Sequence, residues 1–162
     1  MDFKRLDKKD FKTLMGMKNG SEINQNHLML YFLDFDFNPD LITEKLGLEP
    51  HSIGRKGEKY FIGYHKEIEK IRDCSHWKFE WEIKSNDFIG DMIDLFFKEI
   101  IIPRKNLIKE IGENCQMIRL TIVQYYYTGH NPGYGFDREQ VKVLADINAD
   151  IDMDIYCLCE DE

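Results

Sequence analysis

The stretch Gly129–Gly135, which reads Gly-His-Asn-Pro-Gly-Tyr-Gly, is the segment best suited to hold a small ligand. It follows a β-rich segment and precedes a helical pattern, and the backbone amides at such a helix start can bind an anion. His130, Asn131 and Tyr134 would supply polar and aromatic contacts. The stretch lacks the glycine spacing of a dinucleotide-binding turn and the lysine of a phosphate loop, so a purely structural turn remains the alternative.

Arg55 and Lys56 are the second pair of candidate ligand-binding residues. They lie in Gly54–Glu58, whose composition predicts a turn. If folding brings this turn beside the glycine-rich stretch, the two side chains add positive charge to the ligand site. If it does not, they form a solvated corner of a hairpin.

Asp150, Asp152 and Asp154 are spaced two residues apart near the end of the chain. The spacing suggests a calcium loop, but Ile155 occupies the position where such a loop needs glycine. The apolar residues between the aspartates predict a strand instead, with Ile151, Met153 and Ile155 buried and the three carboxylates on one outward face. We expect this face either to bind a basic partner or to keep a sheet edge soluble.

Catalytic and metal-binding patterns are weak. Asp34 and Asp36 share a strand face and could act as paired carboxylates, but strand-end solvation is the simpler interpretation. The cysteines form no Cys-x-x-Cys pair, which favours reduced thiols. A zinc site built from Cys74, His76, Cys157 and Cys159 is the alternative. We therefore predict no catalytic residue, no metal and no cofactor.

Length and charge narrow the class of protein. The chain has 162 residues, 43% of them hydrophobic, and a net charge of −8, which predicts one globular domain. Residues 144–162 contain acidic side chains and no basic ones, which argues against nucleic-acid binding. No apolar run is long enough to span a membrane, and residues 1–26 are too charged for a signal peptide, so we expect a cytoplasmic location.

Hydrophobic periodicity predicts four main strands and several helices. Asn38-Pro39-Asp40 should start a helix that Gly47 ends, and Asp137 with Gln140 forms a capping box. The segment 65–73 fits a short surface helix or an insertion, and Pro103 should break the longest helix. The expected strands are His27–Phe37, Tyr60–Tyr64 (short), His76–Lys84, Cys115–Thr128 and Asp150–Leu158; the expected helices are Asn38–Gly47, Asp87–Ile102, Arg104–Glu110 and Arg138–Asn148.

This order of elements predicts an α+β fold, with a single mixed or antiparallel sheet and helices packed on it. Its opening β-α-β-β-α-β order is ferredoxin-like. We divide the chain into a loosely attached N-terminal arm (1–26), a single α+β domain (27–158) and an acidic tail (159–162).

Several fragments, in this order along the chain, resemble the bacterial family catalogued as domain of unknown function 4279. The resemblance implies a compact cytosolic domain and brings no activity and no catalytic residues. The fragments are Phe37-Asn38-Pro39-Asp40, Leu46-Gly47-Leu48-Glu49-Pro50, Arg55-Lys56-Gly57-Glu58, Trp77, Tyr126-Tyr127-Thr128-Gly129-His130 and Asp150 to Tyr156.

Two functions follow from these observations. The first is a non-catalytic protein-interaction domain, of the immunity or inhibitor type, whose acidic face covers a basic protein partner. The alternative is a small-molecule or peptide-binding domain that uses the Gly129–Gly135 stretch. An enzyme centred on His130 or on the Asp34 and Asp36 pair is a third, less favoured class.

Overall fold

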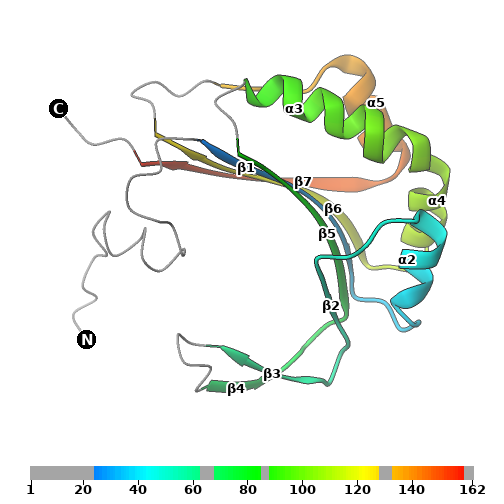
Figure 1. Cartoon of the computed structure of the whole chain (residues 1–162). Helices are drawn as coiled ribbons and strands as arrows, with labels where there is room; N and C mark the ends of the chain where they lie inside the picture. The colour runs from blue at the N-terminus through cyan, green and yellow to red at the C-terminus, as the bar shows by residue number, and fades with distance from the viewer. Residues whose placement is uncertain (1–23, 63–67, 85–87, 128–132, 159–162) are drawn as a thin grey trace.

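The computed structural model describes residues 24–62, 68–84, 88–127 and 133–158 (Figure 1). Its strands are β1 (Gln25–Leu33), β2 (Ser52–Gly54), β3 (Lys59–Ile62), β4 (Ile68–Ile71), β5 (His76–Lys84), β6 (Met117–Tyr126) and β7 (Ala149–Cys157). Its helices are α2 (Asp40–Leu46), α3 (Ile89–Phe96), the π-helical turn η1 (Phe97–Ile101), α4 (Ile102–Gly112) and α5 (Arg138–Asp146).

The main sheet has five strands in the order β2-β5-β1-β6-β7. Neighbouring strands are antiparallel except for β6 and β7, which are parallel. Four of these strands, β1, β2, β5 and β6, have the ferredoxin-like order, with α2 and the continuous helix α3–η1–α4 (the long helix) as their connections. The second strand of this unit is β2 and not the expected short strand at Tyr60–Tyr64, since Tyr60 belongs to β3 of a separate sheet. The strand β7, which follows α5, extends this unit by one parallel strand. The predicted α+β class and the ferredoxin-like first part are confirmed.

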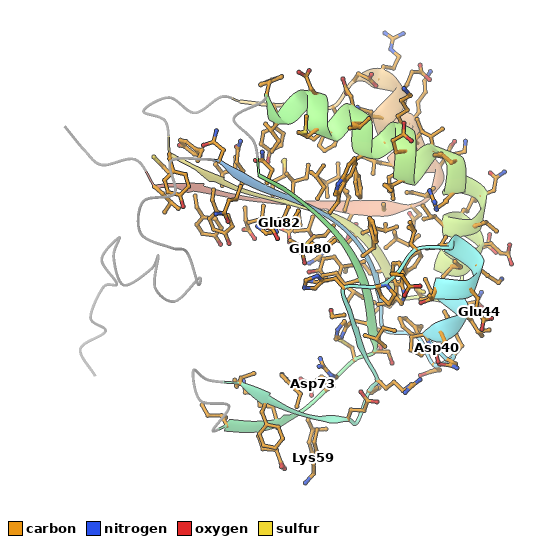
Figure 2. All side chains as sticks on the ribbon, in the orientation of Figure 1. Asp40, Glu44, Lys59, Asp73, Glu80 and Glu82 are labelled. Carbon is orange, nitrogen blue, oxygen red and sulfur yellow. The ribbon has the colours of Figure 1, made fainter. Side chains whose placement is uncertain are left out.

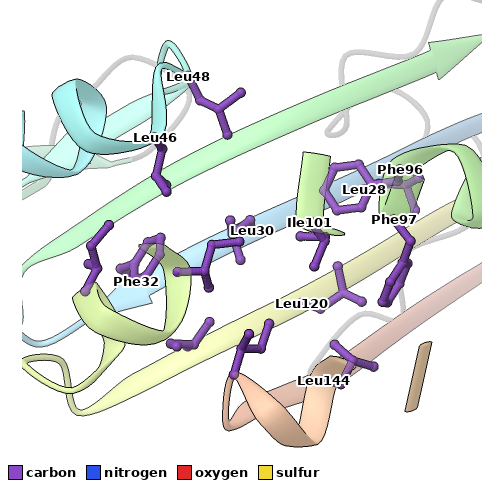
Figure 3. Close-up of a cluster of buried hydrophobic side chains, with 14 of the residues drawn as sticks. Leu28, Leu30, Phe32, Leu46, Leu48, Phe96, Phe97, Ile101, Leu120 and Leu144 are labelled. Carbon is purple, nitrogen blue, oxygen red and sulfur yellow. The ribbon is translucent and has the colours of Figure 1, made fainter. Parts of the chain in front are cut away.

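All helices of the described residues pack on one face of the sheet (Figure 1). Alternate residues of β1, namely Leu28, Leu30 and Phe32, point to that face and are at most 1% exposed. They belong to the same buried cluster as Phe96 and Ile101 of the long helix, and Figure 3 shows this cluster. The strand alternation thus gives the sheet one fully apolar face and leaves the opposite face for other uses.

The helix α2 forms where its sequence signals predict it. The side chain of Asn38 accepts a hydrogen bond from the N–H of Asp40 (3.3 Å), and Gly47 ends the helix with φ of 62°. The indole of Trp77 on β5 donates to the hydroxyl of Thr43 (3.0 Å), which fixes α2 against the sheet. Strand β1, in contrast, ends at Leu33 and not at Phe37, because Asp34 adopts a positive φ of 51° and turns the chain.

The predicted break at Pro103 is wrong. Helix continues from Ile89 to Gly112, through the π-helical turn η1 just before the proline. Pro103 lies in the first turn of α4, where a missing N–H costs least, and the wider turn before it accommodates the ring. Phe88, which the periodicity places on the apolar face, lies just before the helix and is 49% exposed.

The segment 65–73 contributes a strand and not a surface helix. β3 and β4 form a separate two-stranded antiparallel sheet that projects from the β2 end of the main sheet, on the side away from the helices (Figure 1). The two strands form an insertion between β2 and β5. An insertion was one of the two alternatives for this segment, the other being a surface helix. The capping box at the start of α5 is confirmed, since the N–H of Gln140 donates to Asp137 (2.7 Å) and the N–H of Asp137 to Gln140 (2.9 Å).

Candidate binding face

Polar side chains of four strands lie on the side of the main sheet opposite the helices, and we call this side the open face (Figure 2). None of the described helices covers it. The strand registers place alternate residues of four strands on it: His27, Met29 and Tyr31 of β1, Lys78, Glu80 and Glu82 of β5, Arg119, Thr121 and Val123 of β6, and Asp150, Asp152 and Asp154 of β7.

Glu80 is the centre of the charged groups on β5 and β1. Its side chain is 10% exposed and accepts hydrogen bonds from His27 Nδ1 (2.8 Å) and Lys78 Nζ (2.5 Å). His51 Nε2 lies 3.6 Å away. Burial acts to raise the pKa of Glu80, but the bonds from Lys78 and His27 outweigh it and hold the pKa below its ordinary value. Glu80 is therefore a structural anion whose oxygens are already engaged.

Tyr31 and Arg119 are direct neighbours across β1 and β6. Burial raises the pKa of Tyr31, and the charges of Glu80 and Asp152 raise it further, so the phenol stays protonated and can donate a hydrogen bond. Arg119 lies 3.8 Å from Asp152 on β7, while its buried Nε has no hydrogen-bond partner. The Tyr31 hydroxyl already donates to Met29 Sδ (3.4 Å), so among the described residues it is Arg119 that offers an unused donor at this part of the open face.

A hollow of about 330 Å³ lies over this part of the sheet. Side chains of β1, β6 and β7 line it, among them Tyr31, Arg119, Thr121, Asp152 and Asp154. Cationic and anionic groups thus stand side by side around a partly apolar floor. Such a surface can bind a polar or charged group through several hydrogen bonds.

An aromatic cluster borders the hollow on one side. Tyr125 stacks on Tyr156 with ring centroids 5.0 Å apart, and His27 meets Tyr125 edge-on at 5.8 Å. Met29 and Leu158 pack into the same cluster. Because Met29, Tyr125 and Leu158 are buried on a face that no described helix covers, they give the open face a rigid apolar edge.

The structure places Asp150, Asp152 and Asp154 on one face of β7, as the spacing predicts. The expected burial of the residues between them is wrong. Ile151, Met153 and Ile155 are 42%, 53% and 43% exposed, because β7 is the last strand of the sheet and no described helix extends over its outer side. Alternation alone could not show this, since it gives the faces of a strand and not its place in the sheet.

Of the candidate ligand residues, the structure describes Arg55, Lys56 and Tyr134, and it does not bring the first two together with the third. Arg55 donates to Asn38 (2.9 Å), and Lys56 lies 3.9 Å from Asp34, both at the β2 end of the sheet. Tyr134 packs on the main core, and burial, then the charge of Asp154, raises its pKa. Gly54, next to Arg55, is aligned across the sheet with Leu33 of β1, whereas Asp154, whose charge acts on Tyr134, is aligned with His27 of β1. At roughly 3.3 Å per residue, these two levels of the sheet are about 20 Å apart. His130 and Asn131 lie outside the described residues.

The structure does not bring the described residues of the alternative zinc site together either. His76 starts β5 and Cys157 ends β7, at opposite ends of the sheet, and Cys159 lies outside the described residues. Among the residues that the structure describes, no group of three His, Cys, Asp or Glu side chains could hold a metal ion. Among the described cysteines, Cys74 and Cys115 are reduced thiols.

Several residues of the open face were not predicted as site residues. The alternation of apolar and charged residues in His76–Lys84 does predict that Lys78, Glu80 and Glu82 lie on a solvent-facing side of the strand. The sequence carries no signal that His27 would meet Glu80, or that Tyr31 would lie beside Arg119, because both relationships depend on the pairing of strands far apart in the chain.

None of the helices in the described parts of the chain is long and apolar enough to cross a membrane.

Comparison with known proteins identifies the family of the chain. No curated protein and no solved structure matches the chain. The family model described as domain of unknown function (DUF4279) matches residues 22–158, which is most of the sequence, and the chain therefore belongs to this family.

Proposed function

We propose that this chain is a non-catalytic protein-interaction domain that binds a basic partner on the β7 side of its open face. The observation that carries the proposal is the position of the aspartates, since Asp152 and Asp154 line the hollow and Asp150 lies in the same row. Asp152 faces Arg119, whereas neither Asp150 nor Asp154 has an ion pair within the described residues. With a net charge of −8, the chain would attract a cationic surface from a distance.

An inhibitor-type role agrees with these features. A small acidic domain that covers the basic surface of a partner needs a broad face, complementary charge and no catalytic group. The open face provides the first two, and its polar groups are held in place by the sheet.

The test compares two variants that remove the same amount of charge. The first is Asp150→Asn, Asp152→Asn and Asp154→Asn together; the control is Glu44→Gln, Asp91→Asn and Glu113→Gln, all exposed on the helical side. A short oligolysine peptide is the probe. We expect the first variant to lower its association rate by about tenfold at low salt, and the control to change it little.

Addition of salt should reduce the difference between the two variants. Equal rates for the two variants, or a rate of the wild-type chain that does not respond to salt, would contradict the proposal and leave the aspartates only a role in solubility.

A small-molecule or peptide-binding domain that uses Gly129–Gly135 is the second candidate. It is favoured by Tyr134, whose buried hydroxyl has no hydrogen-bond partner among the described residues. A ligand of this site should raise the unfolding temperature of the wild-type chain and lose most of this effect in Tyr134→Phe. An equal shift in both proteins would exclude the hydroxyl as a contact.

A further inference from the structure

The outer edge of β7 pairs with no other strand in the described part of the chain. β7 is the last strand of the five-stranded sheet and pairs only with β6 among the described strands. The N–H of Leu158 donates inward to Tyr126 (2.8 Å). Because the backbone groups of a strand alternate between its two sides, the N–H and C=O groups of Ile151, Met153 and Ile155 point outward.

The side chains of these same three residues are also exposed, at 42%, 53% and 43%. They lie on the helix side of the sheet, whereas Asp150, Asp152 and Asp154 lie on the open face. β7 thus presents a free hydrogen-bonding edge, with an apolar row on one face and an acidic row on the other. Exposed flat edges of this kind are sites where another strand can add to a sheet.

A second copy of the chain does not fit this edge. If two β7 strands paired, the row of aspartates on one would lie next to the same row on the other. Like charges on directly opposed positions destabilise a strand pair. An added strand with basic side chains on one face and apolar ones on the other would instead match both rows of β7.

We infer that the basic partner adds an extended segment to β7 as a sixth strand, with basic residues over the aspartates and apolar residues beside Ile151, Met153 and Ile155; this inference rests on the proposed function. Opposed side chains of paired strands lie about 5 Å apart, which is close enough for ion pairs. Arg119 already lies 3.8 Å from Asp152. The basic residues of the segment therefore face mainly Asp150 and Asp154.

The test uses a peptide in which Lys and Val alternate as the probe, and a peptide in which Glu and Val alternate as its control. The variant Met153→Pro removes an outward N–H and leaves the inward bonds of Asp152 and Asp154 to β6 intact. Met153→Ala, which keeps the N–H, is the matched control. We expect the affinity of the Lys-Val peptide for the wild-type chain to be about tenfold higher than its affinity for the Met153→Pro variant. The Glu-Val peptide should bind neither protein.

Bound peptide should also slow the amide exchange of Ile151, Met153 and Ile155, whose N–H groups are otherwise free. Should Met153→Pro unfold the chain, Met153→Lys serves in its place, because it keeps the backbone and puts a charge in the apolar row. Its binding should be weaker while its unfolding midpoint stays close to that of the wild type.

Each other outcome is distinguishable. Binding that is weakened by the triple aspartate variant but unchanged in Met153→Pro, without protection of the three amides, would overturn the strand addition and leave the proposed function standing. Failure of the Lys-Val peptide to bind at all would overturn both. A wild-type chain that dimerises, and becomes monomeric in Met153→Pro, would show that a second copy occupies the edge.

Discussion

His27 and Glu80 are joined across the β1–β5 pair by a hydrogen bond of 2.8 Å. They are not opposite each other in the register, since His27 faces Glu82 and Glu80 faces Met29, so the bond runs diagonally over the open face. With Lys78 as its second donor, Glu80 connects two central strands on the face that no described helix supports. The pair gives the open face a fixed geometry before any partner arrives.

This arrangement predicts a pH-dependent contribution of Glu80 to stability. Its pKa is lower in the folded chain than its ordinary value, so the stabilisation is present above the ordinary carboxyl pKa of about 4.3 and is lost as pH falls through the lowered value. Glu80→Gln should cost about 1 to 3 kcal/mol at pH 7, and progressively less as the pH falls below the ordinary carboxyl pKa and through the lowered one. Urea unfolding of both proteins at pH 7 and over a series of acidic pH values measures this, with the exposed Glu44→Gln as control. A cost independent of pH would contradict the prediction.

The second prediction concerns the contribution of Arg104 to stability at the π-helical turn. Pro103 has no N–H, so the carbonyl oxygen of Glu99 loses its usual helical donor. The guanidinium of Arg104 donates to that oxygen (2.9 Å) and to the carbonyl oxygen of Ile100 (3.2 Å), and its Nε donates to Leu46 at the end of α2 (2.8 Å). Arg104 thus replaces a backbone donor and joins the long helix to α2.

We expect Arg104→Ala to destabilise the chain by about 1.5 to 3 kcal/mol in denaturant unfolding, because the freed carbonyl groups lose a charged donor. In Pro103→Ala the backbone of residue 103 supplies its own N–H to Glu99. The cost of Arg104→Ala should therefore be smaller when Pro103→Ala is present, and a double-mutant cycle measures the difference. Strictly additive effects would show that the two residues do not share this acceptor.

The third prediction is that substitution of Phe96 causes the largest loss in the free energy of unfolding. It is 1% exposed and packs against Trp81 (ring centroids 5.8 Å apart) and Phe79 (6.4 Å). Phe96→Ala should cost about 3 to 5 kcal/mol, since it leaves a cavity between the long helix and the sheet. Leu95→Ala, at an adjacent position that is 38% exposed, is the control. A loss below about 1 kcal/mol for Phe96→Ala would contradict its place in the core.

The elements that the sequence predicts well are those with local causes. The alternation of Trp77, Phe79 and Trp81 with charged residues defines β5 with its observed ends, and the capping box at Asp137 marks the start of α5. The α+β class also follows, because the order of strands and helices restricts the topology, although the second strand of the ferredoxin-like part is β2 and not the expected segment at Tyr60.

The errors have a different origin. The proline rule failed at Pro103 because a wider turn and the side chain of Arg104 compensate for the missing N–H, and neither is visible in a hydrophobic pattern. Ile151 was expected inside because its alternation is that of a buried strand face. Its exposure depends on β7 being the edge strand, which is a property of the whole sheet.

The candidate site was the least predictable part. Its central contacts, His27 to Glu80 and Arg119 to Asp152, join residues that are far apart in the chain and meet only through strand pairing. The aspartates of β7 could be assigned to one face from their spacing alone, whereas the hollow beside them could not.

The cysteines give the last prediction, a difference in reactivity. Cys115 is half-buried, and burial raises the pKa of its thiol to about 11, whereas Cys74 is exposed. Because the thiolate is the reactive form, iodoacetamide at pH 8 should modify Cys74 many times faster than Cys115, as peptide mapping by mass spectrometry would measure. In urea the two rates should become similar, since unfolding removes the burial. Equal rates in the native chain would mean that the Cys115 thiol opens to solvent, and that the segment between α4 and β6 does not hold it against the core.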